Sequence, residues 1–90
     1  METWNSAKEE LLSNPEVRRE HERLELRFEI ISLLIDARNK LGLTQRELAT
    51  KIGTKQAAIA RLESGNYNPS LKFLEKVATG LGKKVTITLS

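Results

Sequence analysis

The stretch from Leu43 to Gly65, LTQRELATKIGTKQAAIARLESG, decides the fold. It contains two short helical patterns that meet at Gly53, and in each one apolar residues repeat at i, i+1 and i+4. This spacing places them on one narrow buried face of each helix. The apolar residues are Leu48, Ala49, Ile52, Ala58, Ile59 and Leu62. Because glycine permits the positive φ of a sharp turn, the pattern predicts a helix-turn-helix unit with helices at about 45–52 and 55–64.

The second helix of this unit keeps one face free of acids. At 100° per residue, one arc opposite the apolar face contains Gln56, Ala57, Ala60 and Arg61, and no acid occurs from Thr54 to Arg61. Carboxylates normally stabilise a first helical turn, so their absence indicates a helix end that approaches phosphates. Glutamine and arginine also fit the edges of adenine and guanine in DNA. The alternative is an ordinary solvated helix face.

Helix signals continue on both sides of this unit. Two capping boxes, at Ser6 and Thr44, and the Asn14-Pro15 pair predict helix starts. We expect helices at about 7–12, 15–24 and 26–41, and a further helix from Ser70 to about Gly80. Spacings of four and three alternate along α-helical positions occupied by Val17, His21, Leu24, Phe28, Ile31 and Ile35, so it stays open whether residues 15–41 form one helix or two.

The period changes after residue 82. Val85, Ile87 and Leu89 alternate with two threonines, which predicts one short β-strand. No second strand is evident in the sequence, so this strand would pair with the same strand of a second copy across a two-fold axis. These three residues are therefore the candidates for dimerisation, and the alternative is a frayed tail.

Composition restricts the class of protein. The chain has 90 residues and no cysteine, which excludes disulfides and thiolate metal sites and is typical of a reducing cytoplasm. Residues 1–26 contain four Lys or Arg against seven Glu, a net charge of −3, whereas residues 27–90 contain eleven against five acids, a net charge of +6. This asymmetry predicts two binding surfaces of opposite sign. No apolar run is long enough to span a membrane.

At these residues the sequence resembles the Xre, or lambda-repressor-like, helix-turn-helix family. The residues that carry the resemblance are Gln45, Leu48, Ala49, Gly53, Ile59, Leu62, Glu63 and Gly65, within a region from about 28 to 81. The resemblance implies an all-α helix-turn-helix bundle at 27–82, preceded by a helical extension at 1–26 and followed by the strand at 83–90. It also implies a homodimer that binds a palindromic operator in double-stranded DNA.

The resemblance assigns roles by position. Base-reading roles pass to Gln56, Ala57 and Arg61, and phosphate-contacting roles to Thr44, Gln45, Lys55, Asn66, Tyr67 and Asn68. Lys55 stands where the family often has a hydroxyl cap, and we favour a phosphate contact over a cap. Arg38 and Glu63 occupy positions of a partly buried structural ion pair, and a carboxylate so near the DNA face needs such a cation.

The extension and the domain follow one another as NPEVRREHERLELRFEIISLLIDARNKLGLTQ and end in the predicted VTITL strand. In this order, nearly the whole chain resembles the HigA-type antitoxins of bacterial toxin–antitoxin modules. The resemblance implies a second partner, a basic toxin of the RelE/HigB type that cleaves messenger RNA. An acidic amphipathic extension could dock on such a cationic surface through apolar anchors. The candidate anchors are Trp4, Leu11, Leu12, Val17 and Leu24. The alternative is that Trp4, Leu11 and Leu24 fold back on the bundle as an extra core helix.

No motif in the sequence indicates an enzyme, a metal site or a cofactor. His21 is the one histidine and has no sulfur ligand or second imidazole beside it, and the GLGKK run lacks the pattern of a phosphate loop. The two resemblances together imply a cytoplasmic antitoxin that represses its own operon. Two alternatives stay open: a phage-type or metabolic repressor without a toxin, and a protein-interaction adaptor that no longer binds DNA.

Overall fold

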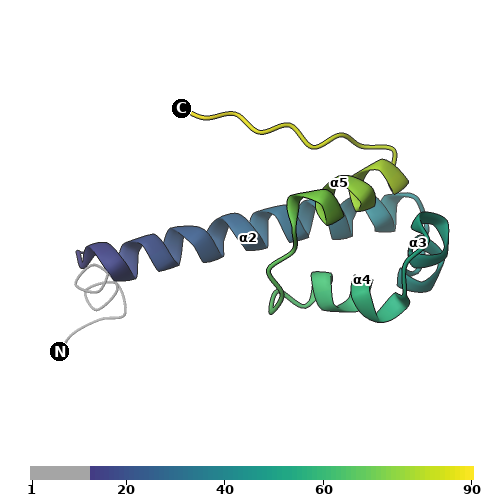
Figure 1. Ribbon diagram of the computed structural model, residues 1–90, viewed down its shortest axis with the longest axis horizontal. Coiled ribbons are helices and arrows are strands. Elements are labelled where there is room, and N and C mark those ends of the chain that lie inside the picture. The colour runs from purple at the N-terminus through teal and green to yellow at the C-terminus, as the bar shows by residue number, and fades with distance from the viewer. Residues whose placement is uncertain (1–12) are drawn as a thin grey trace.

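The computed structural model describes residues 13–90, and within them it contains four α-helices. They are α2 (Pro15–Lys40), α3 (Gln45–Ile52), α4 (Gln56–Glu63) and α5 (Leu71–Gly80). Three shorter helices gather around one end of α2, and the rest of α2 extends away from them (Figure 1). The prediction of an all-α helix-turn-helix bundle is confirmed, whereas the predicted helix at 7–12 lies outside the described residues.

The question of one helix or two at 15–41 is settled in favour of one. Helix α2 runs unbroken through 26 residues, which corresponds to a length of about 39 Å at 1.5 Å per residue. The side chain of Asn14 caps its start by accepting hydrogen bonds from the amides of Glu16 and Val17, and Pro15 occupies the first turn. Since Leu24 to Leu26 contain neither proline nor glycine, nothing in this segment interrupts the helix.

The helix-turn-helix unit forms as its caps and its glycine predict. Thr44 and Glu47 make a complete capping box at the start of α3, and these hydrogen bonds to Thr44 hold the pKa of Glu47 below its ordinary value. Gly53 ends α3 with φ 73°, in the left-handed region. Helix α4 then begins at Gln56, so the predicted span of 55–64 is longer than the observed helix by one residue at each end.

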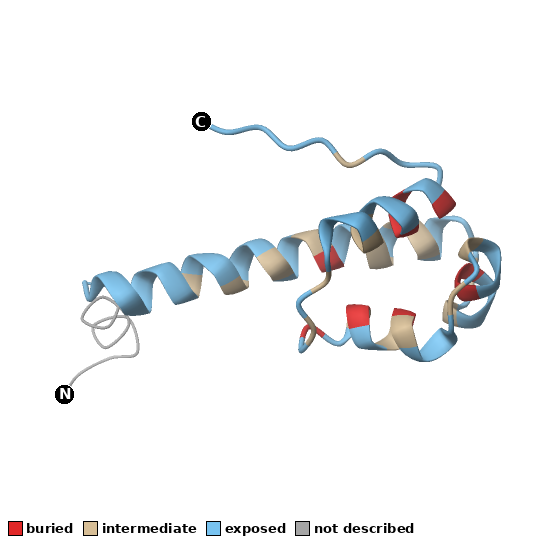
Figure 2. Ribbon diagram, in the orientation of Figure 1, coloured by how far each residue is buried: buried red, intermediate tan, exposed pale blue. Residues whose placement is uncertain are grey.

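One hydrophobic cluster holds α3, α4 and α5 together. Its buried members are Leu48, Ala49, Ile59, Leu62, Val77 and Leu81. Figure 2 shows the buried residues on the inner faces of these helices, where Leu34 and Ala37 of α2 complete the cluster. The backbone of Gly80 lies so close to Ile52 that a Cβ atom there would overlap its side chain. Burial of each large aliphatic side chain contributes about 1.5–3 kcal/mol, so this small cluster is the main stabilising feature of the bundle.

The predicted C-terminal β-strand is wrong for the single chain. No strand forms anywhere in residues 13–90, and residues 83–90 run as an extended segment away from α5 (Figure 1). Ile87 is 64 % exposed and Leu89 is 93 % exposed, while Val85 is half-buried. The alternation of residues correctly indicates an extended, two-faced segment, but a strand requires a neighbour to pair with, and the described part of the chain offers none.

No helix within residues 13–90 is long and apolar enough to cross a membrane.

Candidate nucleic-acid interface

Helix α4 presents two different faces. Ile59 and Leu62 are buried in the core, whereas the side chains of Gln56, Ala57 and Arg61 are exposed. These are the three residues expected to read bases, and the helix brings them together on one outward surface. Ala60, on the same arc, is half-buried. A short row of small and forked polar side chains on a convex helix is the arrangement that enters a major groove.

The start of α4 is suited to an anion. Lys55 occupies the cap position but makes no side-chain capping hydrogen bond, and the first turn contains no acidic residue. The first amide N–H groups of α4 therefore keep their partial positive charge. Lys55 adds an exposed cationic side chain beside them. This combination of amides and a lysine is a favourable environment for a phosphate group.

A partly buried ion pair joins α2 to the end of α4. Arg38 donates from Nε to Glu63 Oε2 at 2.8 Å and from Nη2 to Glu63 Oε1 at 2.9 Å, which makes the pair bidentate. The two side chains are only 13 % and 9 % exposed. Arg38 Nη1 also donates to the carbonyl of Leu43 at 2.7 Å. The hydrogen bonds to Glu63 and the charge of its carboxylate raise the pKa of Arg38. The pair therefore fixes both the loop before α3 and the C-terminal end of α4.

Two glutamines extend this network to the exposed face. Gln45 Nε2 donates to Glu63 Oε1 at 3.1 Å, and Gln56 Nε2 donates to Gln45 Oε1 at 3.2 Å. One N–H and the carbonyl oxygen of the Gln56 amide remain available, which are the donor and acceptor that pair with adenine. The chain of contacts thus restricts the orientation of the Gln56 amide. Sequence reasoning missed both glutamine contacts, because they depend on how α3 and α4 cross.

The remaining predicted DNA-contacting residues lie in the loop after α4 and at the start of α3. Asn66 and Asn68 are exposed, whereas Tyr67 is half-buried. Gly65 turns the chain with φ 81°, and its Cα hydrogens face the ring of Phe28 on α2 so closely that a Cβ atom would not fit. Thr44 and Gln45 lie at the start of α3, where Thr44 Oγ1 already accepts from the amide of Glu47 at 3.0 Å. The loop and the start of α3 thus supply polar groups in addition to those of α4.

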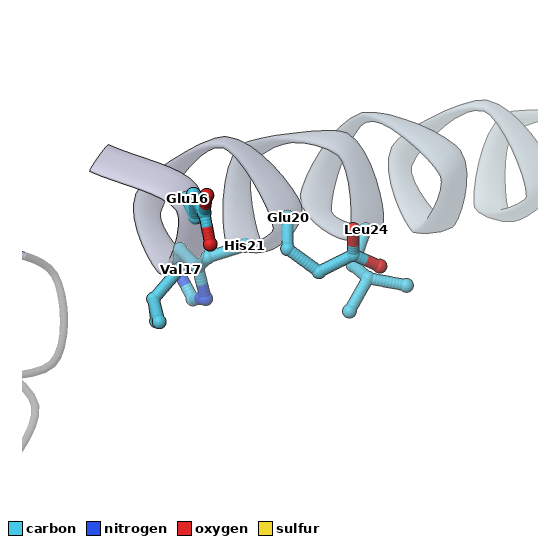
Figure 3. A pocket seen from close by; sticks show the side chains of 5 residues that line it. All are labelled: Glu16, Val17, Glu20, His21 and Leu24. Atoms are coloured by element: carbon cyan, nitrogen blue, oxygen red, sulfur yellow. The ribbon is translucent and has the colours of Figure 1, made fainter. Parts of the chain in front are cut away.

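The extended part of α2 presents a second candidate surface. Val17, His21 and Leu24 lie on the same side of α2, with Glu16 and Glu20 beside them, around an open hollow (Figure 3). Val17 is 37 % exposed and Leu24 is half-buried, and neither belongs to the core cluster of the bundle. His21 Nε2 lies 2.7 Å from Glu25 Oε1, and no group of residues in 13–90 has the composition of a metal site. The other three predicted anchors, Trp4, Leu11 and Leu12, lie outside the described residues.

A protein-family model described as helix-turn-helix matches residues 34–87. An uncharacterized HTH-type transcriptional regulator of Haemophilus influenzae is 38 % identical over 84 residues, which cover 93 % of this chain and 82 % of that protein. A second such regulator, from Methanothermobacter thermautotrophicus, is 42 % identical over 53 residues, 59 % of this chain and 77 % of that protein.

A solved structure matches almost the whole chain. It is described as a toxin–antitoxin module from Streptococcus pneumoniae, and the matched chain is 34 % identical with a TM-score of 0.66. The match covers 99 % of this chain and 93 % of that chain. The similarity is therefore not confined to the helix-turn-helix unit but extends along α2.

The ion pair gives a direct test of the scaffold. We expect Glu63→Gln to lower the free energy of unfolding by about 1–3 kcal/mol, because Arg38 would keep its buried charge without a carboxylate partner. Chemical denaturation of the variant and the parent measures the difference. Glu75→Gln, at an exposed position of α5, is the matched control and should change stability by less than about 0.5 kcal/mol. Equal stability of the Glu63 variant and the parent would contradict a structural role for the pair.

Proposed function

Since this chain belongs to the helix-turn-helix family, we propose that it is a sequence-specific DNA-binding repressor which also acts as the antitoxin of a toxin–antitoxin module. In this proposal α4 enters the major groove of an operator, and the extension of α2 binds a toxin. The observation that carries the DNA-binding part is the exposed row of Gln56, Ala57 and Arg61 beside an acid-free helix start. The toxin part is supported by the similarity of nearly the full chain to a chain from a toxin–antitoxin module.

Within the operator, the base-reading roles fall to Gln56, Ala57 and Arg61. Gln56 would pair with adenine through the donor and acceptor that its contact with Gln45 leaves available, and Arg61 would pair with guanine. Phosphate contacts would come from Lys55, from the start of α3 at Thr44 and Gln45, and from the loop residues 66–68. These groups lie at the start of α3, at the start of α4 and in the loop after α4, so they would fix its orientation while α4 itself carries the sequence preference.

A palindromic operator requires two copies of α4 related by a two-fold axis. We place the contact between the two copies at residues 83–90, where Ile87 and Leu89 are exposed and Val85 is half-buried. Contact between these apolar side chains of the two copies would remove them from water.

The toxin-binding surface would be the apolar side of the α2 extension. Val17 and Leu24 are accessible there, and acidic residues flank them at Glu16 and Glu20. Such a surface matches a partner that is basic and has an apolar groove, as expected of a toxin of the RelE/HigB type that cleaves messenger RNA. By repressing the operon that encodes both proteins, the chain would regulate its own synthesis.

Two other functions would use the same fold. A repressor without a toxin would bind DNA but capture no partner through α2, and an adaptor would bind a protein but no operator. Salt dependence separates the adaptor from a DNA-binding protein, because log K for DNA falls by about 0.9 per phosphate contact as log salt rises.

Replacement of Arg61 tests base reading. We expect Arg61→Ala to cost about 1–3 kcal/mol at one base position in each half-site, because the forked contact to guanine is lost. Competition binding against operators varied at each position measures this loss. Arg19→Ala removes the same charge from the exposed side of the α2 extension and should leave the preference at that position unchanged. Equal losses on operator and random DNA would remove Arg61 from base reading.

Replacement of Ile87 tests the two-fold contact. The parent protein should sediment as a dimer, and Ile87→Asp should shift it towards the monomer because a charge would enter the contacting segment. Lys84→Asp also introduces an acidic residue into this segment, but at an exposed position outside the Val85, Ile87 and Leu89 set, and should remain dimeric. A dimer that persists in the Ile87 variant would place the contact elsewhere.

A pair of leucines on α2 tests partner binding. Leu24→Asp should abolish co-purification with a basic protein encoded by the adjacent reading frame, and should also abolish relief of its growth inhibition. Leu26→Asp makes the same change about 200° around the helix and should retain both. Operator binding should survive in the two variants, since both residues lie outside the core cluster. Co-purification that survives Leu24→Asp would contradict binding through this side of α2.

A further inference from the structure

The guanidinium of Arg61 lies over an aromatic ring. Its Cζ atom is 5.8 Å from the ring centroid of Tyr67, within the range of a cation–π contact. Within residues 13–90, no carboxylate or hydrogen-bond acceptor contacts this guanidinium. The arginine side chain has several rotatable bonds and would otherwise adopt many conformations in solution. The ring is therefore the contact that restricts where the Arg61 head group lies.

The ring of Tyr67 is itself fixed from behind. It meets the ring of Phe73 edge to face, with centroids 6.4 Å apart and an angle of 78° between the planes. Phe73 packs against the core cluster, so the ring of Tyr67 contacts a side chain that the interior of the bundle holds in place. Tyr67 is half-buried for this reason, whereas its neighbours Asn66 and Asn68 are exposed.

The backbone between Arg61 and Tyr67 is also held. Ser64 Oγ donates to the carbonyl of Arg61 at 2.7 Å and accepts from the amide of Asn66 at 3.2 Å. This bridge closes the turn that brings the loop back alongside α4. A short backbone segment held by hydrogen bonds therefore keeps the side chains of Arg61 and Tyr67 close together.

We propose that Tyr67 is a positioning residue for base recognition: its ring presents the Arg61 guanidinium in the orientation that pairs with guanine. The proposal rests on the DNA-binding function proposed above. It adds Tyr67 as a residue that affects specificity by holding Arg61. A forked donor held in place before binding loses less freedom when it pairs with a base, which favours the matched base over the others. The aromatic ring of Tyr67 performs this positioning role, whereas its hydroxyl group would make any contact to phosphate.

Two substitutions separate ring from hydroxyl. Tyr67→Phe keeps the ring and should retain full discrimination at the base pair that Arg61→Ala identifies. Tyr67→Leu removes the ring and should reduce discrimination at that pair by about 2- to 5-fold, the range of an exposed cation–π contact, with other positions unchanged. In the Arg61→Ala background Tyr67→Leu should cause no further loss of discrimination. Ratios between operators measured on the same sample are independent of any loss of folded protein.

The contact can also be observed without DNA. In the free protein, the side-chain NMR signals of Arg61 should show a ring-current shift that persists in Tyr67→Phe and disappears in Tyr67→Leu. If both variants lose the same affinity at every operator position, the hydroxyl contacts phosphate and the proposal is overturned. Unchanged discrimination between bases in Tyr67→Leu would also overturn it. A parent protein with the ring-current shift but no operator preference would instead contradict the proposed DNA-binding function, and the positioning role with it.

Discussion

The ion pair between Arg38 and Glu63 is the contact on which the interface depends. It is bidentate and largely shielded from solvent, and its two residues come from α2 and from the last turn of α4. Through Leu43 and Gln45 the same pair reaches the loop before α3 and the first residue of α3. A hydrophobic cluster alone would allow short helices to shift against one another, whereas a pair of directional hydrogen bonds fixes their register. The orientation of α4 relative to the rest of the bundle follows from this constraint.

The sequence predicts those parts of the fold that local chemistry determines. The bounds of α3 and α5 follow from the capping residues Thr44 and Ser70, whose side chains accept from the amides of Glu47 and Phe73 as expected. The strand predicted at 83–90 does not form, because alternating residues indicate only an extended, two-faced segment, whereas a strand also needs a neighbouring strand, which the described residues do not offer. Contacts such as Gln45 to Gln56 and Arg61 to Tyr67 depend on helix crossing and loop path, which no local pattern encodes.

Helix α2 joins the two candidate surfaces into one rigid element. Its C-terminal half contributes Ile31, Leu34 and Ala37 to packing and Arg38 to the ion pair, while its N-terminal half leaves the bundle with Val17 and Leu24 accessible. An isolated helix of this length is marginal in water, so continuity with the packed half stabilises the extension. An apolar side on a helix held away from its own core is an accessible surface that a partner can cover.

Among the four described helices, only α4 lacks a side-chain cap at its start. Side chains of Asn14, Thr44 and Ser70 cap α2, α3 and α5, whereas Lys55 leaves the start of α4 without such a bond. The missing cap costs about 1 kcal/mol, and α4 also lacks the acidic residue that stabilises the first turn of α2 and α3. Complete burial of Ile59 and Leu62 and the bonds of Glu63 offset this loss from the other end of the helix. A hydroxyl at position 55 would remove the deficit, so the open helix start is the feature expected if the proposed phosphate contact is made there.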